Sequence, residues 1–225
     1  MNKLSTGSGL IRTIYDYENK KITMDFSGNG ELNMCFRNDA SILFYAANSY
    51  HTSYISLSKE IKIGFVNGKI KKVEHLILPY LFNFRHFVEL ELKAIYAALT
   101  DYSPELTHDI DKLLDQTEQA IKERKYDDIN IRFNQITEDG FNNSKNEALL
   151  IFQDLKSFVH QYTSTESAVE YYRYIFENNK KELVLNNPVI DLDYNNTEKL
   201  FNNIHYTFNS LLIKLNEFVY IQFRF

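Results

Sequence analysis

Residues 76–102 read LILPYLFNFRHFVELELKAIYAALTDY, and this stretch decides the fold of the larger part of the chain. Its apolar residues recur at helical spacing rather than in alternation, which predicts one long helix from Leu76 to Tyr102. Pro79 is expected in the first turn of this helix, where a missing amide hydrogen is tolerated. The stretch therefore favours a helical class for the chain from residue 73 onward.

Further helical patterns follow this first one. Thr107 is expected to cap a helix that runs to about Lys125, with Asp109 and Asp111 near its positive end. The later predicted helices span about Tyr126–Thr137, Asn143 or Ser144 to Thr163, and Glu198–Tyr220, with residues 164–178 helical or irregular. Together these patterns predict a mainly antiparallel helical bundle.

The N-terminal part of the chain shows a different period. Between residues 10 and 72, apolar and polar residues alternate, which is typical of a sheet with one solvent-facing side. The alternating residues are Ile22, Met24 and Phe26, then Leu32, Met34 and Phe36, then Ile61, Ile63 and Phe65. Asn67-Gly68 is typical of a β-hairpin turn, with Ile70 opening a return strand. The prediction is an α+β chain: a β-rich N-terminal region of residues 1–72 with an antiparallel sheet, then a helical bundle of residues 73–225.

Composition excludes several classes of protein. The net charge of -5 and the pI near 5.7 argue against a broadly basic surface that binds nucleic acid, although a local basic pocket is compatible with them. Cys35 is the single cysteine, so an internal disulfide and a thiolate-cluster metal site are both excluded. No signal peptide and no stretch of about 18 apolar residues occurs, which predicts a cytoplasmic protein without a membrane span.

A charged stripe on the helix around residue 89 is the candidate site. With successive residues about 100° apart, Glu89 lies about 40° and Lys93 about 80° from Arg85, and His86 lies on the same face. Most apolar residues fall on the opposite face, while Glu91 lands among them and needs a partner or an exposed edge. One interpretation is an amphipathic helix whose ion pairs face solvent. The other is a binding site, because an antiparallel second helix would bring His108 and Asp109 beside the stripe.

A family resemblance appears at these residues. The run Arg85-His86-x-x-Glu89-Leu90-x-Leu92-Lys93-Ala94, followed by Thr107-His108-Asp109-Ile110-x-Lys112-Leu113-Leu114, resembles the opening of bacterial HEPN-like proteins (higher eukaryotes and prokaryotes nucleotide-binding). The segment Ser167–Tyr174, which contains Arg173, is similar to a later segment of that family, at a longer spacing. The resemblance covers about residues 75–222.

This resemblance implies an all-helical bundle that dimerises and, in many members, a metal-independent ribonuclease of phage defence or toxin–antitoxin systems. The catalytic signature of such members is an Arg, four to six residues, then a His. None of the six histidines of this chain has an Arg at that distance before it. The ribonuclease signature is therefore absent, which favours binding of RNA, a nucleotide or a protein partner.

Other chemistry finds little support in the sequence. No histidine lies at a useful spacing from the acidic pairs, so neither a metal nor another cofactor is expected. The binding residues predicted for the site are Arg85, His86, Glu89, Lys93, His108, Asp109 and Arg173. The leading hypothesis is a non-catalytic HEPN-like module that forms a homodimer. The alternative is a divergent metal-independent ribonuclease that uses His86 or His108 with Arg85.

Overall fold

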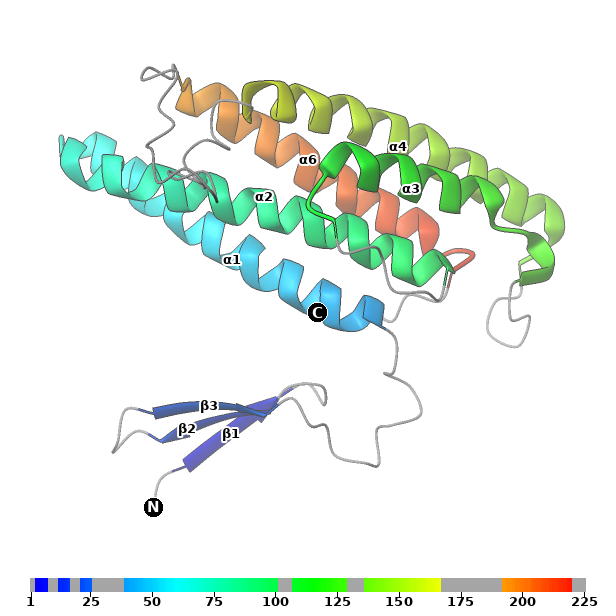
Figure 1. Cartoon of the computed structure of the whole chain (residues 1–225), viewed down its shortest axis with the longest axis horizontal. Helices are drawn as coiled ribbons and strands as arrows, with labels where there is room; N and C mark the ends of the chain where they lie inside the picture. The colour runs from blue at the N-terminus through cyan, green and yellow to red at the C-terminus, as the bar shows by residue number, and fades with distance from the viewer. Residues whose placement is uncertain are drawn as a thin grey trace, which may run out of the picture.

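A computed structural model of the chain describes residues 3–7, 12–16, 21–25, 39–100, 107–128, 136–166 and 192–219. Its long elements are helices, and Figure 1 shows them lying lengthwise beside one another. They are α1 (Asp39–Val66), α2 (Ile70–Thr100), α3 (Ile110–Glu123), α4 (Glu138–Glu166) and α6 (Tyr194–Leu215), with a 3₁₀ turn, η2, at Tyr126–Asp128. Helix α1 packs along α2, α4 packs along α6, and α3 contacts both α2 and α4. The predicted helical bundle is confirmed.

The predicted α+β class is wrong, because the structure is a helical bundle whose first helix lies inside the region predicted to be β-rich. Residues 39–66 form α1, and residue 73, where the second region was expected to begin, lies within α2. The strands that the structure describes are short: β1 (Lys3–Gly7), β2 (Arg12–Asp16) and β3 (Lys21–Asp25), paired antiparallel in the order β1-β2-β3. Residues 26–38, which include the predicted strand around Met34, lie outside the described residues.

The helical period of α1 is hard to recognise in the sequence, because the buried face of this helix is not uniformly apolar. The buried positions are Ala40, Phe44, Ala47, Tyr54, Ser58, Ile61 and Gly64, with His51 half-buried between them. These positions are three, four or seven residues apart, as one face of a helix requires. Ile63 and Phe65, which continue the alternation from Ile61, are 48% and 46% exposed. The alternation at residues 61–65 therefore predicted the wrong element.

The Asn67-Gly68 turn joins two helices rather than two strands. Gly68 has a φ of 63°, a left-handed conformation that glycine adopts without strain. The amide of Lys69 donates to the carbonyl of Gly64 at 2.8 Å, and the amide of Gly68 donates to that of Phe65 at 3.2 Å. This pair of bonds is the Schellman arrangement that ends an α-helix. The same glycine property that suits a β-hairpin thus closes α1 and starts an antiparallel helical hairpin.

Several helix ends differ from the prediction. Helix α2 begins at Ile70, so Pro79 lies well inside it rather than in its first turn. Asp109, not Thr107, is the N-cap of α3: its side chain accepts a hydrogen bond from the amide of Lys112. Helix α4 begins before Asn143, and α6 begins at Tyr194 after the N-cap Asp193. The short helix predicted near residue 130 falls largely outside the described residues.

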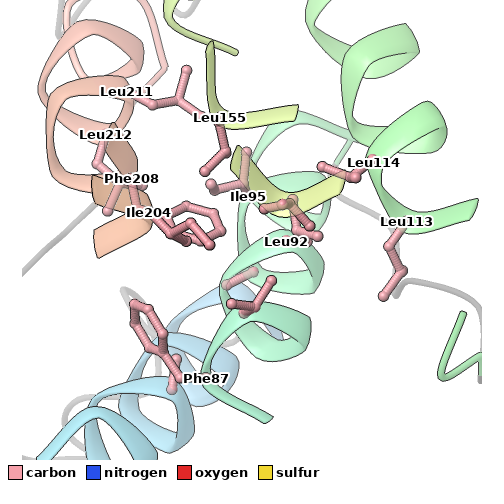
Figure 2. Packing of buried hydrophobic residues seen from close by; sticks show 14 of the residues in the cluster. Phe87, Leu92, Ile95, Leu113, Leu114, Leu155, Ile204, Phe208, Leu211 and Leu212 are labelled. Carbon is pink, nitrogen blue, oxygen red and sulfur yellow. The ribbon is translucent and has the colours of Figure 1, made fainter. Parts of the chain in front are cut away.

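The hydrophobic core lies where α2, α3, α4 and α6 meet (Figure 2). Side chains from all four helices converge there: Phe87, Leu92, Ile95, Leu113, Leu114, Leu155, Ile204, Phe208, Leu211 and Leu212. Towards α1 the core becomes aromatic, and the rings of Phe84 and Phe201 stack with centroids 3.4 Å apart. Phe218 and Val219, just beyond α6, are also buried, so the start of the apolar C-terminal segment docks on the core.

Candidate functional site

Helix α2 and the start of α3 bring together five of the residues predicted for the site. Arg85, His86, Glu89 and Lys93 lie on one face of α2, as their helical spacing requires. His108 immediately precedes Asp109, the cap of α3, and so reaches this face from the neighbouring helix. We call these five residues the charged cluster.

Hydrogen bonds hold the charged cluster together around one carboxylate. The Oε1 atom of Glu89 lies 2.7 Å from Nζ of Lys93 and 2.9 Å from Nδ1 of His108. Arg85 donates from Nη2 to the backbone carbonyl of His108 at 2.9 Å. The bonds from Arg85 and Glu89 to His108 connect residues that are 23 and 19 positions apart in the chain. They attach the beginning of α3 to the middle of α2.

Burial and charge act in opposite directions on Glu89. Burial by itself raises the pKa of this carboxyl group, because a charge is poorly solvated inside the protein. The ammonium group of Lys93 and the imidazole of His108 outweigh burial, and the pKa of Glu89 is lowered from its ordinary value. Glu89 is only 2% exposed, so its negative charge depends on these partners.

The two histidines of the cluster differ in exposure. The side chain of His108 is 62% exposed, whereas that of His86 is 15% exposed. The ring of His86 lies between aromatic neighbours, 4.3 Å from the ring of Phe82 and 5.0 Å from that of Tyr50 by centroid. Its Nδ1 atom is 4.0 Å from Oε2 of Glu89. His108 is therefore the imidazole of the cluster that a large ligand in solution reaches most easily.

The interpretation of the stripe as solvent-facing ion pairs is wrong. Arg85, Glu89 and Lys93 are all buried, with at most 9% of each residue exposed. Asp109 is exposed and acts as the helix cap, so it lies at the margin of the cluster rather than inside it. Arg173 falls outside the described residues. The cluster is thus a buried polar junction with one accessible imidazole.

A second group of polar residues, which the sequence did not assign to a site, lines a cavity of about 690 Å³ between α1, α2 and α6. Its titratable members are His51 from α1, Glu91 from α2 and His205 from α6. The two imidazole rings are stacked, with centroids 4.2 Å apart and planes 18° apart. Glu91 is 5% exposed, and its Oε2 atom has no hydrogen-bond partner among the described residues.

One signal in the sequence did point to this cavity. Glu91 falls among apolar positions of its helix, and such a carboxyl group needs a partner or an exposed edge. Among the described residues Glu91 has no hydrogen-bond partner for Oε2, and it is only 5% exposed. Burial raises its pKa to about 8, so it is mostly uncharged at neutral pH. The histidines carried no comparable signal, because they come from helices far apart in the sequence.

Two further findings concern the described residues alone. They contain no group of three or more His, Cys, Asp or Glu side chains placed to hold a metal ion. None of the helices described is both long enough and apolar enough to cross a membrane. Comparisons with protein-family models, with curated proteins and with solved structures gave no match to this chain.

Proposed function

We propose that this chain is a non-catalytic binding module of the HEPN-like type, which binds RNA through the surface that His108 and His86 form on the charged cluster. A nucleotide and a protein partner are the other ligands that this surface would suit. The proposal includes a cytoplasmic setting and a role in bacterial defence or a toxin–antitoxin pair, as the family resemblance implies.

The observation that carries the proposal is the junction itself. A buried Arg, Lys and Glu cost free energy to desolvate, and an apolar helix face would pack against α3 without that cost. The charges nevertheless converge beneath an exposed imidazole, where they fix the position of its ring. The imidazole of His108 is held in position by Glu89, and the ring of His86 lies on the same cluster beside Phe82 and Tyr50. Such rings are suited to contact a phosphate or a base.

The alternative, a divergent metal-independent ribonuclease, is favoured by one specific contact. Nδ1 of His108 is 2.9 Å from the Glu89 carboxylate, and a carboxylate that orients an imidazole is a common arrangement in acid–base catalysis. The second ring nitrogen of His108 would then transfer the proton. Arg85 would act indirectly, since its guanidinium holds the backbone of His108.

One experiment separates the two functions. Purified protein is incubated with mixed RNA that includes tRNA, in chelator and without metal, and the same samples are run in a band-shift assay. His108→Ala and His86→Ala are the test variants. His160→Ala is the matched control, because His160 is also a half-exposed histidine beside a carboxylate, 3.2 Å from Asp111, but on α4.

Each outcome has a distinct meaning. Retarded but intact RNA, with retardation weakened at least tenfold in His108→Ala and unchanged in the control, supports the binding module. Cleavage that disappears in His108→Ala supports the ribonuclease. RNA that is neither retarded nor cleaved removes both forms of the RNA proposal, and nucleotides and partner proteins would remain as ligands.

A homodimer is part of the same proposal. Four apolar residues, Ile63, Phe65, Val66 and Ile70, are exposed where α1 turns into α2, and Val66 is 86% exposed. Clustered exposed apolar side chains commonly mark an interface. Sedimentation of the wild type and of Val66→Asp at micromolar concentration tests this surface: a wild-type monomer would contradict the dimer, and an unaffected dimer would place the interface elsewhere.

A further inference from the structure

We infer that the cavity between α1, α2 and α6 is a binding site for a small organic cation, in which Glu91 supplies the counter-charge. This site is separate from the charged cluster, and the inference does not depend on the proposed function. It follows from the size of the cavity, from three buried polar atoms without partners, and from the chemical character of the lining.

The cavity has the dimensions and composition of a small-molecule site. A volume of about 690 Å³ lies within the range of roughly 300–1,000 Å³ that is usual for ligand pockets. Its walls combine apolar side chains with a few polar groups: Phe44, His51, Phe87, Glu91, His205 and Asn209. Phe87 also belongs to the packed core shown in Figure 2, so this wall is held in place by the bundle.

Three buried polar atoms at this cavity lack a hydrogen-bond partner. They are Oε2 of Glu91, Nε2 of His51 and Nδ1 of His205, judged against the residues that the structure describes. Buried polar atoms in proteins are nearly always paired, because leaving one unpaired is costly. The residues that carry these atoms come from three different helices and all line this one cavity, so its wall contains polar groups whose hydrogen-bonding capacity is unused among the described residues.

The lining suits a cation better than an anion. Glu91, the three asparagine side chains and the imidazole of His51 can accept hydrogen bonds, and no Lys or Arg is among the described residues that line the cavity. In His205, Nε2 accepts a hydrogen bond from Nδ2 of Asn209, so the Nδ1 atom of the neutral ring carries the proton and can donate to an acceptor on the ligand. Burial lowers the pKa of His51, and burial together with His51 lowers the pKa of His205 to about 4, so both rings are neutral near pH 7. Phe44 and Phe87 also line the cavity, and aromatic rings attract cations that lie over their faces.

A cation also resolves the anomaly of Glu91. A carboxylate without a partner is unfavourable in a buried site, so the group stays protonated, with its pKa raised to about 8. An ammonium or amidinium group at hydrogen-bond distance would favour the ionised form. Binding therefore transfers the Glu91 proton to solvent, and the carboxylate and the cation form an ion pair.

The affinity for a cation should rise with pH. Of the titratable groups at the cavity, Glu91 from α2 becomes a carboxylate as pH rises, while His51 from α1 and His205 from α6 lose positive charge. With a pKa of about 8, Glu91 is ionised in about one tenth of molecules at pH 7 and in most at pH 8.5. If only the ionised form binds the cation, the affinity is about eight-fold higher at pH 8.5.

Calorimetric titration with three matched probes tests the inference on the full chain. Benzylammonium, benzyl alcohol and benzoate share one ring and differ in charge. We expect benzylammonium to bind at least tenfold more tightly than the other two, more tightly at pH 8.5 than at pH 7, and with proton release measured in buffers of different ionisation enthalpy.

Two variants locate the site. Glu91→Gln keeps the size of the side chain and removes the charge, and it should weaken benzylammonium at least tenfold. Ile213→Trp places a bulky ring at an exposed lining position, 70% exposed in the wild type, and should weaken all binding in the cavity. Asp154→Asn, an exposed carboxylate on α4, is the control and should leave affinity unchanged.

The inference is overturned by any of three results. Equal affinity for benzyl alcohol and benzylammonium would mean that the charge of the ligand is not recognised. Unchanged benzylammonium binding in folded Glu91→Gln, checked by circular dichroism, would place the cation elsewhere. The absence of measurable binding of benzylammonium by the wild type at millimolar concentration and pH 8.5 would remove the cation site.

Discussion

Replacement of Glu91 by Gln should make this protein more stable, and increasingly so as pH rises. Glu91 is 5% exposed, and its Oε2 atom has no partner among the described residues, so its ionised form is strongly disfavoured in the folded protein. In the unfolded chain the same carboxyl group is solvated and ionises with its ordinary pKa of 4.5. Folding above that pH therefore requires the uptake of a proton, which the Gln variant does not need.

The size of the effect follows from the two pKa values. Burial raises the folded pKa of Glu91 to about 8, so the contribution of this group to stability is greatest below pH 4.5 and is lost as pH rises towards 8. Within that window the free energy of unfolding of the wild type falls, relative to the variant, by about 1.4 kcal/mol for each pH unit. Between pH 5 and pH 7 the difference should grow by about 3 kcal/mol.

Urea denaturation of both proteins at pH 5, 6 and 7, followed by circular dichroism, measures this difference. His51 and His205 also titrate abnormally: with pKa values lowered from 6.5, they cost stability as pH falls below that value. Both proteins contain them, so their contribution largely cancels in the comparison. A stability difference that stays constant from pH 5 to pH 7 would refute the description of Glu91 as a buried, uncharged acid.

Three further changes test the packing and the charged cluster. A Cβ at Gly64 would lie 2.6 Å from Cγ2 of Val73, so Gly64→Ala should lower the free energy of unfolding by about 1–3 kcal/mol. The same substitution in a Val73→Ala background should cost less. A Gly64→Ala variant that is more stable than the wild type in urea denaturation would contradict this close helix contact. Phe201→Ala removes the ring stacked on Phe84 and should cost about 3–5 kcal/mol in the same assay, so a loss below about 1 kcal/mol would be incompatible with this packing. Glu89→Ala leaves the buried ammonium group of Lys93 without its carboxylate and should cost about 3–5 kcal/mol at pH 7. A neutral effect would mean that the cluster is solvated.

The helices after residue 73 could be read from the sequence because their apolar faces have a strong helical period. Phe84, Val88 and Leu92 recur at this spacing in α2, and all three are buried. The sequence of α1 does not indicate a helix, because its buried face includes Ala47, Ser58 and other small or polar residues, which give little hydrophobic signal. Local alternation near Ile61 then resembled a strand.

The charged cluster was partly predictable for a similar reason. Residues four apart on one helix must share a face, so Arg85, Glu89 and Lys93 could be grouped from their spacing alone. Their burial could not be predicted, because it depends on how α3 lies across α2. The cap of α3 illustrates the limit: Asp109 rather than Thr107 begins the helix, and this sets where His108 meets Glu89.

The sequence by itself determined the helical pattern from residue 73 onward, the shared face of the stripe and the misfit of Glu91, because each depends on periodicity along one segment. The tertiary structure alone decided that the stripe is buried and that His51, Glu91 and His205 border one cavity. These three residues lie on helices separated by tens to more than a hundred positions in the chain. Their meeting depends on the packing of whole helices, and no local pattern encodes it.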